Sequence, residues 1–141
     1  MSNIEQQPAL EKRFALLIED DIFCQKVQSH CLYELGYTVE IVTDAATAID
    51  RVEHNVYHLI VLDLGLPDQS GELVIRAVRE YVANQKTPLI VATAHADGPM
   101  QQKCLYMGAD VVFIKPFNKQ TLARAIEFCQ STERTYPQIA I

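Results

Sequence analysis

Acidic side chains directly follow two of the most apolar segments of this 141-residue chain. Asp63 follows the unbroken run Leu59–Leu62, and the acidic residues 19–21 follow the run Phe14–Ile18. Short apolar runs of this kind are typical of buried strands. At the carboxyl ends of parallel strands, such acids face the crevice in which open α/β sheets bind ligands. The sequence therefore predicts one shared site that binds a cation and uses a carboxylate for chemistry.

Two further apolar runs end in residues that complement the acids. Thr93 follows Leu89–Ala92, and Lys115 follows Val111–Ile114. Carboxylates that share one crevice repel each other by about 4 kcal/mol per pair at 4 Å and an effective dielectric constant near 20. Lys115 supplies one positive charge against this repulsion, and a divalent cation with oxygen ligands would supply the rest. Mg2+ accepts carboxylates together with water, so we expect it here.

Each of these residues also has an ordinary structural role when it is taken alone. Asp21 precedes a predicted helix and can cap its first turn. Asp63 stands before a turn that contains proline and glycine, where aspartate often shapes the turn. Thr93 could be a polar loop residue, and Lys115 a solvated surface charge. We favour the shared site because all of them fall at the ends of predicted strands.

The elements that position these residues alternate regularly. The apolar pattern predicts strands at 14–18, 37–42, 59–62, 89–92 and 111–114, and helices at 22–35, 45–53, about 72–82, about 100–107 and 119–128. Continuously apolar strands are buried on both faces, which indicates a parallel sheet covered by helices on both sides. Right-handed crossovers then favour a flavodoxin-like (βα)5 fold, an α/β/α sandwich with a doubly wound, five-stranded sheet. We expect one domain over 13–131, a flexible leader over 1–12 and a C-terminal tail over 132–141.

Composition excludes several classes of function. The net charge is −6, and no basic run supports direct binding to nucleic acid. No apolar stretch approaches the roughly 20 residues that span a bilayer, and the first residues lack the apolar centre of a signal peptide. We therefore expect no membrane insertion and a cytoplasmic location. The cysteines form no C-x-x-C pair, and we expect buried thiols rather than disulfides, with Cys24, Val27, Cys31 and Leu35 on the inward face of the first helix.

Four ordered motifs resemble the response-regulator receiver domain of two-component signalling. They are Leu16–Asp21, Asp63–Pro67 with Gly71, Thr93–Ala94, and Lys115–Phe117, and the resemblance covers about residues 13–130. It implies that Asp63 takes a phosphoryl group from a phosphohistidine, on a histidine kinase or a histidine phosphotransfer protein. It also implies that Glu19, Asp20, Asp63 and the main-chain carbonyl of Gly65 hold Mg2+. The phosphoryl oxygens would then meet Thr93, the Ala94 N–H and Lys115.

The resemblance further implies a signalling switch rather than an enzyme. Phosphorylated Asp63 would draw Thr93 and Lys115 inward and repack the surface formed by the fourth helix, the fifth strand and the fifth helix. A phosphorylation-dependent homodimer is compatible with such a switch. The match of residues 24–27 and 35–37 to receivers of hybrid histidine kinases leaves two origins open, a stand-alone regulator and a domain of a hybrid kinase.

Three positions depart from the family pattern or vary within it. The family usually has an aromatic residue three positions before the lysine, where this chain has Val112. Phe113 is one residue later, and strand alternation points it to the opposite face. Gly65 and His95 occupy the two positions that influence how fast the acyl phosphate hydrolyses, although His95 could equally be a solvated loop residue. We therefore expect that Asp63 can be phosphorylated, but that the conformational change at the output surface is smaller than is usual for the family or involves a different surface.

Two other classes of protein use a similar fold. A phosphatase of the haloacid-dehalogenase type usually has a second acid two residues after its aspartyl nucleophile, and Gly65 cannot serve as that acid. A flavin- or nucleotide-binding domain would need a glycine-rich phosphate loop after the first strand, where this chain has an acidic cluster. The receiver domain therefore remains the leading interpretation.

Overall fold

The computed structural model describes residues 12–95, 97–116 and 118–131. Its elements are β1 (Arg13–Ile18), α1 (Ile22–Glu34), β2 (Tyr37–Val42), α2 (Ala45–His54), β3 (Leu59–Leu62), α3 (Gly71–Glu80), the short 3-10 helix η2 (Val82–Asn84), β4 (Leu89–Thr93), α4 (Gly98–Met107), β5 (Val111–Ile114) and α5 (Lys119–Ser131). The predicted alternation of strands and helices is confirmed. Apart from Lys12, the predicted leader and tail lie outside the described residues.

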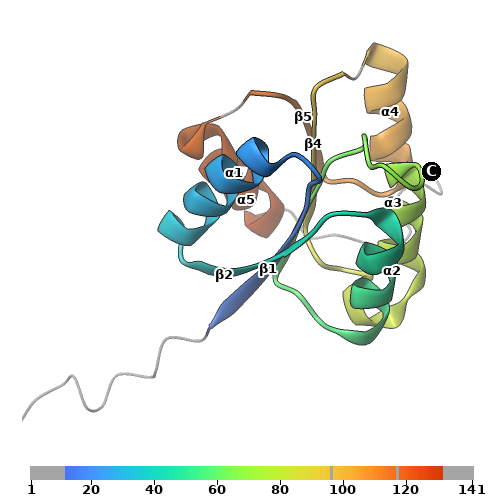
Figure 1. Ribbon diagram of the computed structural model, residues 1–141, viewed down its shortest axis with the longest axis horizontal. Helices are drawn as coiled ribbons and strands as arrows, with labels where there is room; N and C mark the ends of the chain where they lie inside the picture. Colours follow the sequence, from blue (N-terminus) through green and yellow to red (C-terminus); the bar gives the residue numbers. More distant parts are fainter. Residues whose placement is uncertain (1–11, 96, 117, 132–141) are drawn as a thin grey trace, which may run out of the picture.

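The strands form one parallel sheet in the order β2-β1-β3-β4-β5. Helices α1 and α5 cover one face of this sheet, and α2, α3 and α4 cover the other (Figure 1). This is the predicted flavodoxin-like sandwich. Among the described residues, no helix combines the length and the apolar character that crossing a membrane requires.

Side-chain alternation along β1 supplies both halves of the hydrophobic core. Leu16 and Ile18 pack on the α2–α4 side, and Ala15 and Leu17 pack on the α1–α5 side. Each fully buried leucine or isoleucine stabilises the fold by about 1.5–3 kcal/mol. A slip of one residue would exchange the two faces, so burial on both sides fixes the register of β1 against its neighbours. The acids that follow β1 and β3 are positioned by this register.

Polar side chains cap the first turns of helices α1 and α5, and Asp21 does so as predicted. Asp21 accepts a hydrogen bond from the Cys24 N–H, and Asn118 accepts one from the Thr121 N–H. Helix α4 begins at Gly98, earlier than predicted, because Asp97 caps it and Pro99 fits the first turn.

The predicted inward face of α1 is partly wrong. Gln28, Cys31 and Leu32 are the buried residues of this helix, whereas Val27 is 42% exposed. The helix is rotated so that a polar residue, Gln28, lies inward, and an apolar pattern cannot reveal such a rotation. All four cysteines are free thiols, as predicted, but Cys24 and Cys129 are only partly buried.

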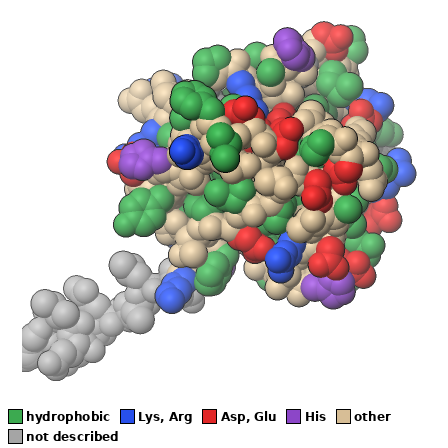
Figure 2. Space-filling model, in the orientation of Figure 1, with side chains coloured by type: hydrophobic (Ala, Val, Ile, Leu, Met, Phe, Trp, Pro, Cys, Tyr) green, Lys and Arg blue, Asp and Glu red, His purple; other side chains and the backbone are tan. Residues whose placement is uncertain are grey.

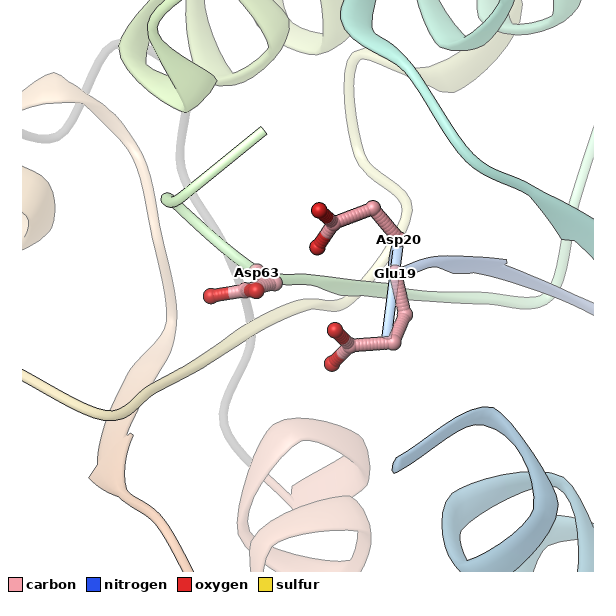
Figure 3. Close-up of side chains that lie close together, drawn as sticks. All are labelled: Glu19, Asp20 and Asp63. Atoms are coloured by element: carbon pink, nitrogen blue, oxygen red, sulfur yellow. The ribbon is translucent and has the colours of Figure 1, made fainter. Parts of the chain in front are cut away.

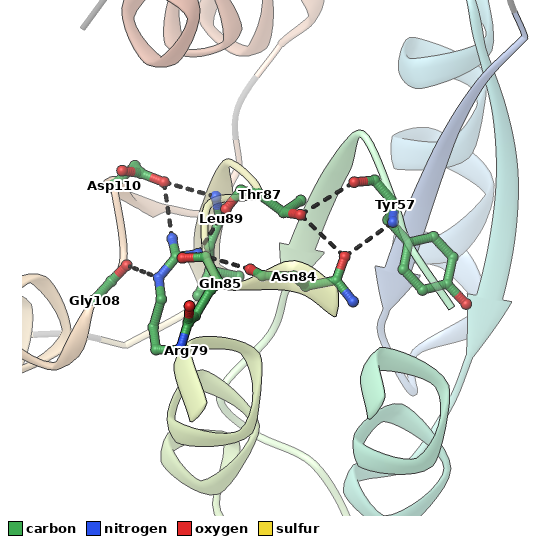
Figure 4. A network of polar contacts seen from close by, with 8 residues as sticks. All are labelled: Tyr57, Arg79, Asn84, Gln85, Thr87, Leu89, Gly108 and Asp110. Atoms are coloured by element: carbon green, nitrogen blue, oxygen red, sulfur yellow. Dashed lines mark hydrogen bonds and ion pairs between the residues drawn. The ribbon is translucent and has the colours of Figure 1, made fainter. Parts of the chain in front are cut away.

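A buried arginine connects α3 to the edge of the sheet opposite the strand-end acids (Figure 4). Arg79 is only 2% exposed, and its Nε donates a hydrogen bond to the Gly108 carbonyl at 2.9 Å. Its Nη2 lies 3.1 Å from Asp110 Oδ2, which also accepts a hydrogen bond from the Leu89 N–H. Its Nη1 also donates to the main-chain carbonyls of Asn84, Gln85 and Thr87.

This Arg79 network fixes the amino ends of β4 and β5. Asp110 binds Leu89 twice, through its carboxylate and through its own N–H, which donates to the Leu89 carbonyl. Gly108 adopts a φ of 130°, and a Cβ at this position would lie 2.6 Å from Arg79 Cγ. A side chain at position 108 would therefore be strained and would also displace the arginine. Because β5 is the edge strand of the sheet that the described residues form, this network sets where the strand begins.

We predict that Arg79→Met lowers the free energy of unfolding by about 3–5 kcal/mol, because the buried Asp110 carboxylate and several buried carbonyls lose their donor. Urea unfolding followed by circular dichroism measures this change. Arg76→Met is the matched control, since Arg76 is exposed on the same helix, and it should change stability by less than about 0.5 kcal/mol. Equal effects of the two substitutions would contradict the role of the network.

Candidate functional site

Three carboxylates meet beyond the carboxyl ends of β1 and β3. Ile18 is paired with Leu62, so that the next residues along the two strands, Glu19 and Asp63, emerge side by side. One carboxylate oxygen from each of Glu19, Asp20 and Asp63 lies within 4.8 Å of the others. Figure 3 shows the three carboxyl groups turned towards the same space. Glu19 and Asp63 are buried and Asp20 is exposed, so the cluster is open to solvent on one side.

Lys115 supplies the positive charge at this cluster. Its Nζ lies 2.5 Å from Glu19 Oε1 and 3.4 Å from Asp63 Oδ2, and its side chain is only 13% exposed. Three carboxylates and one ammonium leave two negative charges when all of them are ionised. The arrangement therefore favours a divalent cation, and the donor set of carboxylate oxygens is the one that Mg2+ prefers.

The pKa values at the cluster reflect burial and this ion pair. Burial raises the pKa of Glu19, although the hydrogen bond from Lys115 and the bond from the Asp21 N–H oppose the rise. For Lys115, burial lowers the pKa, but the hydrogen bond with Glu19 and the charge of Asp63 outweigh it, so the pKa is raised. Lys115 therefore keeps its charge at neutral pH and remains able to bind an anion.

The main chain of Asp21, the cap of α1, and a side chain within α1 hold Glu19 in place. The Asp21 N–H donates to Glu19 Oε2 at 3.1 Å, and Gln25 Nε2 donates to the Glu19 carbonyl at 2.8 Å. The carboxylate of Asp21 caps α1 instead of joining the cluster, and the hydrogen bonds from Cys24 lower its pKa. The sequence predicted this capping role, but it gave no signal for Gln25.

The hydroxyl of Thr93 lies at the end of the next strand. Thr93 is buried, and its carbonyl accepts a hydrogen bond from the Lys115 N–H at 2.8 Å. Among the described residues, its Oγ1 makes a single 3.5 Å contact, with the His95 carbonyl, which is long for a hydrogen bond. Ala94 and His95 are exposed and line a surface groove together with Met100 and Ile114.

The loop after β3 passes close to the cluster. The Gly65 N–H donates to Asp63 Oδ1 at 3.2 Å, and a Cβ at Gly65 would meet only Asp63 Oδ2, at 4.0 Å. At Gly71, by contrast, a Cβ would lie 2.7 Å from Leu64 Cα. Gly71 is therefore required for the close passage of the loop, whereas Gly65 leaves open space beside the carboxylate.

Val112 and Phe113 point to opposite faces of β5, as alternation predicts. Val112 packs against the core on the α2–α4 side, and Phe113 packs against the core on the α1–α5 side. The side of β5 that faces α4 therefore carries a small aliphatic side chain at this position.

The sequence matches the family described as the response regulator receiver domain over residues 15–127. The transcription factor SKN7 of Candida albicans is 32% identical over 79% of this chain, and the regulatory protein VanRB of Enterococcus faecalis is 32% identical over 82% of it. The probable histidine kinase 2 of rice is 30% identical over 86% of this chain. The chain spans 20%, 50% and 13% of the length of these three relatives, respectively.

Solved structures of receiver domains share the fold. The receiver domain of a sensor histidine kinase from Pseudomonas aeruginosa, with a magnesium ion coordinated in its active site cleft, superposes with a TM-score of 0.78 at 30% identity and covers 86% of this chain and 100% of its own. The chemotaxis response regulator CheY4 of Vibrio cholerae gives a TM-score of 0.77 at 26% identity and covers 84% of this chain and 99% of its own.

We predict that Asp20→Asn stabilises the metal-free protein and removes its stabilisation by Mg2+. Relief of repulsion at the cluster should raise stability by about 1 kcal/mol, which is a few degrees in Tm. Mg2+ should raise the Tm of the wild type, because a ligand of the native state stabilises it. Thermal unfolding with and without MgCl2 measures both effects.

Glu80→Gln is the control for this experiment, because it removes one exposed carboxylate from the far end of α3. Its Mg2+ response should equal that of the wild type. An undiminished Mg2+ response in Asp20→Asn would contradict a metal site at the cluster.

Proposed function

Because the chain belongs to the response regulator receiver domain family, we propose that it is the phosphoacceptor module of a two-component or phosphorelay system and that Asp63 receives the phosphoryl group. The observation that carries this proposal is the cluster of Glu19, Asp20 and Asp63 with Lys115 inserted among the acids. The buried carboxylate of Asp63 lies in this cluster and has an open side next to Gly65.

The chemistry is the transfer of a phosphoryl group between two nucleophiles. A carboxylate oxygen of Asp63 attacks phosphorus, the new O–P bond forms, and the P–N bond to the donor imidazole breaks with its electron pair left on nitrogen. Such transfer depends mainly on positioning and on charge neutralisation. Glu19, Asp20, Asp63 and the Gly65 carbonyl would hold Mg2+, which supplies charge neutralisation between the carboxylates and the phosphoryl oxygens.

Three groups around Asp63 would bind the phosphoryl oxygens. Lys115 keeps its charge, and it would exchange part of its contact with Glu19 for a phosphoryl oxygen. The Thr93 hydroxyl and the Ala94 N–H would bind the others. These contacts exist only in the phosphorylated state, so they shift the population towards a conformation in which β5 and α4 are repacked.

The lifetime of the acyl phosphate would depend on Gly65 and His95. Gly65 places no side chain beside Asp63, so water has access to the phosphoryl group from that side. His95 is exposed two residues after Thr93 and lines the surface groove with Ala94, so a phosphoryl donor or water that approaches along this groove would meet it.

An apolar surface on α1 supports a protein partner that carries the phosphohistidine. Ile22 and Phe23 are 69% and 71% exposed at the start of α1. Beside them, a hollow of about 100 Å3 is lined by Phe23, Val27, Lys115 and Pro116, among others. Hydrophobic side chains are visible on this part of the surface (Figure 2). Apolar surface next to a reactive group fits a protein donor, a histidine kinase or a histidine phosphotransfer protein, better than a small substrate.

The context of the domain is part of the proposal. Its relatives include both histidine kinases and regulators, so a stand-alone regulator and a hybrid kinase are the two contexts that we propose. In both, the domain acts in the cytoplasm, where ATP supplies the phosphoryl groups.

A surface on the α4–β5 side could allow two phosphorylated copies to pair. Its exposed apolar residues are Leu105, Tyr106 and Ile114.

We predict that acetyl phosphate with Mg2+ adds one phosphoryl group to the wild type and none to Asp63→Asn. Intact mass spectrometry detects the addition, and removal of Mg2+ with EDTA should prevent it. Asp50→Asn, an exposed aspartate on α2, should behave like the wild type. Labelling of Asp63→Asn, or labelling that is independent of Mg2+, would refute the proposal.

A second prediction concerns the α1 surface. Phe23→Ala should slow phosphoryl transfer from a purified, phosphorylated histidine phosphotransfer protein by at least about tenfold, because central apolar contacts dominate docking. It should leave labelling by acetyl phosphate unchanged. Tyr33→Ala is the control, since Tyr33 is 74% exposed near the other end of the same helix. A parallel loss in Tyr33→Ala would argue against a docking surface at the start of α1.

A further inference from the structure

Asp68 connects the loop after β3 to a different helix. Its Oδ1 accepts a hydrogen bond from the Ala45 N–H at 2.8 Å, and its Oδ2 accepts one from the Ala46 N–H at 3.0 Å. These amides belong to the first turn of α2, more than 20 residues earlier in the sequence. Both carboxylate oxygens are thus used to hold the loop against α2.

The first turn of α2 provides a strong site for this carboxylate. The first amides of a helix have no partner within the helix, and the helix dipole favours a negative charge beside them. Asp44 already binds the Thr47 N–H, and Asp68 binds the two amides that precede it. The hydrogen bonds from Ala45 and Ala46 lower the pKa of Asp68, so the carboxylate stays ionised at neutral pH.

The other anchor of the loop lies at its base. The N–H groups of Gly71 and Leu66 both donate to the Leu64 carbonyl, at 3.2 and 3.0 Å. Gly71 packs so closely on Leu64 that no side chain fits there. Gly65 lies between this base and the contact of Asp68 with α2, and its N–H binds Asp63. The position of Gly65 is therefore set from both ends of the loop.

We propose that Asp68 is a positioning residue of the phosphoryl site: by binding the first turn of α2 it holds residues 64–68, and with them the Gly65 carbonyl, in the geometry that Mg2+ binding requires. This inference rests on the proposed function, because it takes the Gly65 carbonyl as a metal ligand. Asp68 itself is not one of the proposed metal ligands, because both of its carboxylate oxygens bind amides of α2. Partners that orient metal ligands in this way typically change metal affinity by about 10- to 100-fold.

The experiment compares two aspartates that cap the same helix. Asp68→Ala removes the contact between the loop and α2, whereas Asp44→Ala removes a cap of α2 but leaves the loop anchored. The Mg2+ dissociation constant of the full chain is measured by NMR titration of MgCl2, and the Tm of each variant is measured without metal. We expect Asp68→Ala to raise the dissociation constant at least about tenfold and Asp44→Ala to raise it less than about twofold, at a similar loss in Tm.

Asp68→Asn provides a second variant if Asp68→Ala folds poorly. Asparagine keeps one oxygen acceptor, so its dissociation constant should lie between those of the wild type and Asp68→Ala. Wild-type affinity in a folded Asp68→Ala, or equal weakening by Asp44→Ala, would overturn the inference and leave the proposed function intact. Absence of Mg2+ binding by the wild type, together with no labelling of Asp63, would overturn both.

Discussion

The contact of Lys115 with Glu19 and Asp63 is the interaction on which the site depends. Burial of apolar strands on both faces of the sheet brings the ends of β1 and β3 together, and it brings their carboxylates together as well. Without a cation among them, the acids would oppose the packing that assembles them. Lys115 offsets part of this repulsion and leaves a net negative charge. The same lysine therefore stabilises the metal-free fold. The negative charge that remains on the cluster is what a divalent cation would neutralise.

Polar contacts between distant segments hold the short elements around this site. Strand β5 has only four residues and a single neighbouring strand, so the Arg79 network at its amino end fixes where Lys115 emerges. The loop after β3 is held by Asp68 on α2. The two contacts differ in the free energy of removing the side chain from water. Arg79 is buried and needs all its hydrogen-bond partners to offset this free energy, whereas Asp68 is exposed and exchanges hydrogen bonds with water for hydrogen bonds with helix amides. The positions of the site residues thus depend on contacts that lie outside the site.

The sequence predicted the fold and the grouping of the site residues because both follow from local signals. Apolar runs indicated the strands. Because parallel strands all end at the same edge of a sheet, Glu19, Asp63 and Lys115 were predicted to lie at that edge. Contacts between segments far apart in the sequence left no such signal. Arg79 has the appearance of a surface arginine in an amphipathic helix, and Asp68 that of a turn residue, because no local pattern marks their partners. Asp68 binds main-chain amides 22 and 23 residues earlier. Arg79 binds main-chain carbonyls 5 to 29 residues later and the carboxylate of Asp110. The burial of Gln28 in place of Val27 was missed for a related reason, since only packing decides the rotation of α1.

The small side chain of Val112 bears on which parts of the surface would respond to the proposed phosphorylation of Asp63. The amino end of β5 is fixed by Asp110 and Arg79, so displacement of Lys115 towards an anion is accommodated at the carboxyl end of the strand. An aromatic ring at position 112 would have to move with the strand, whereas valine packs against the α2–α4 core and has no ring to reorient. Phe113 lies on the other face, against α1 and α5, and cannot substitute for it. If Asp63 is phosphorylated as we propose, binding of the phosphoryl group by Thr93 and Lys115 would therefore change the loop after β4 and the start of α4, where the exposed groove is, rather than rotate a side chain within β5.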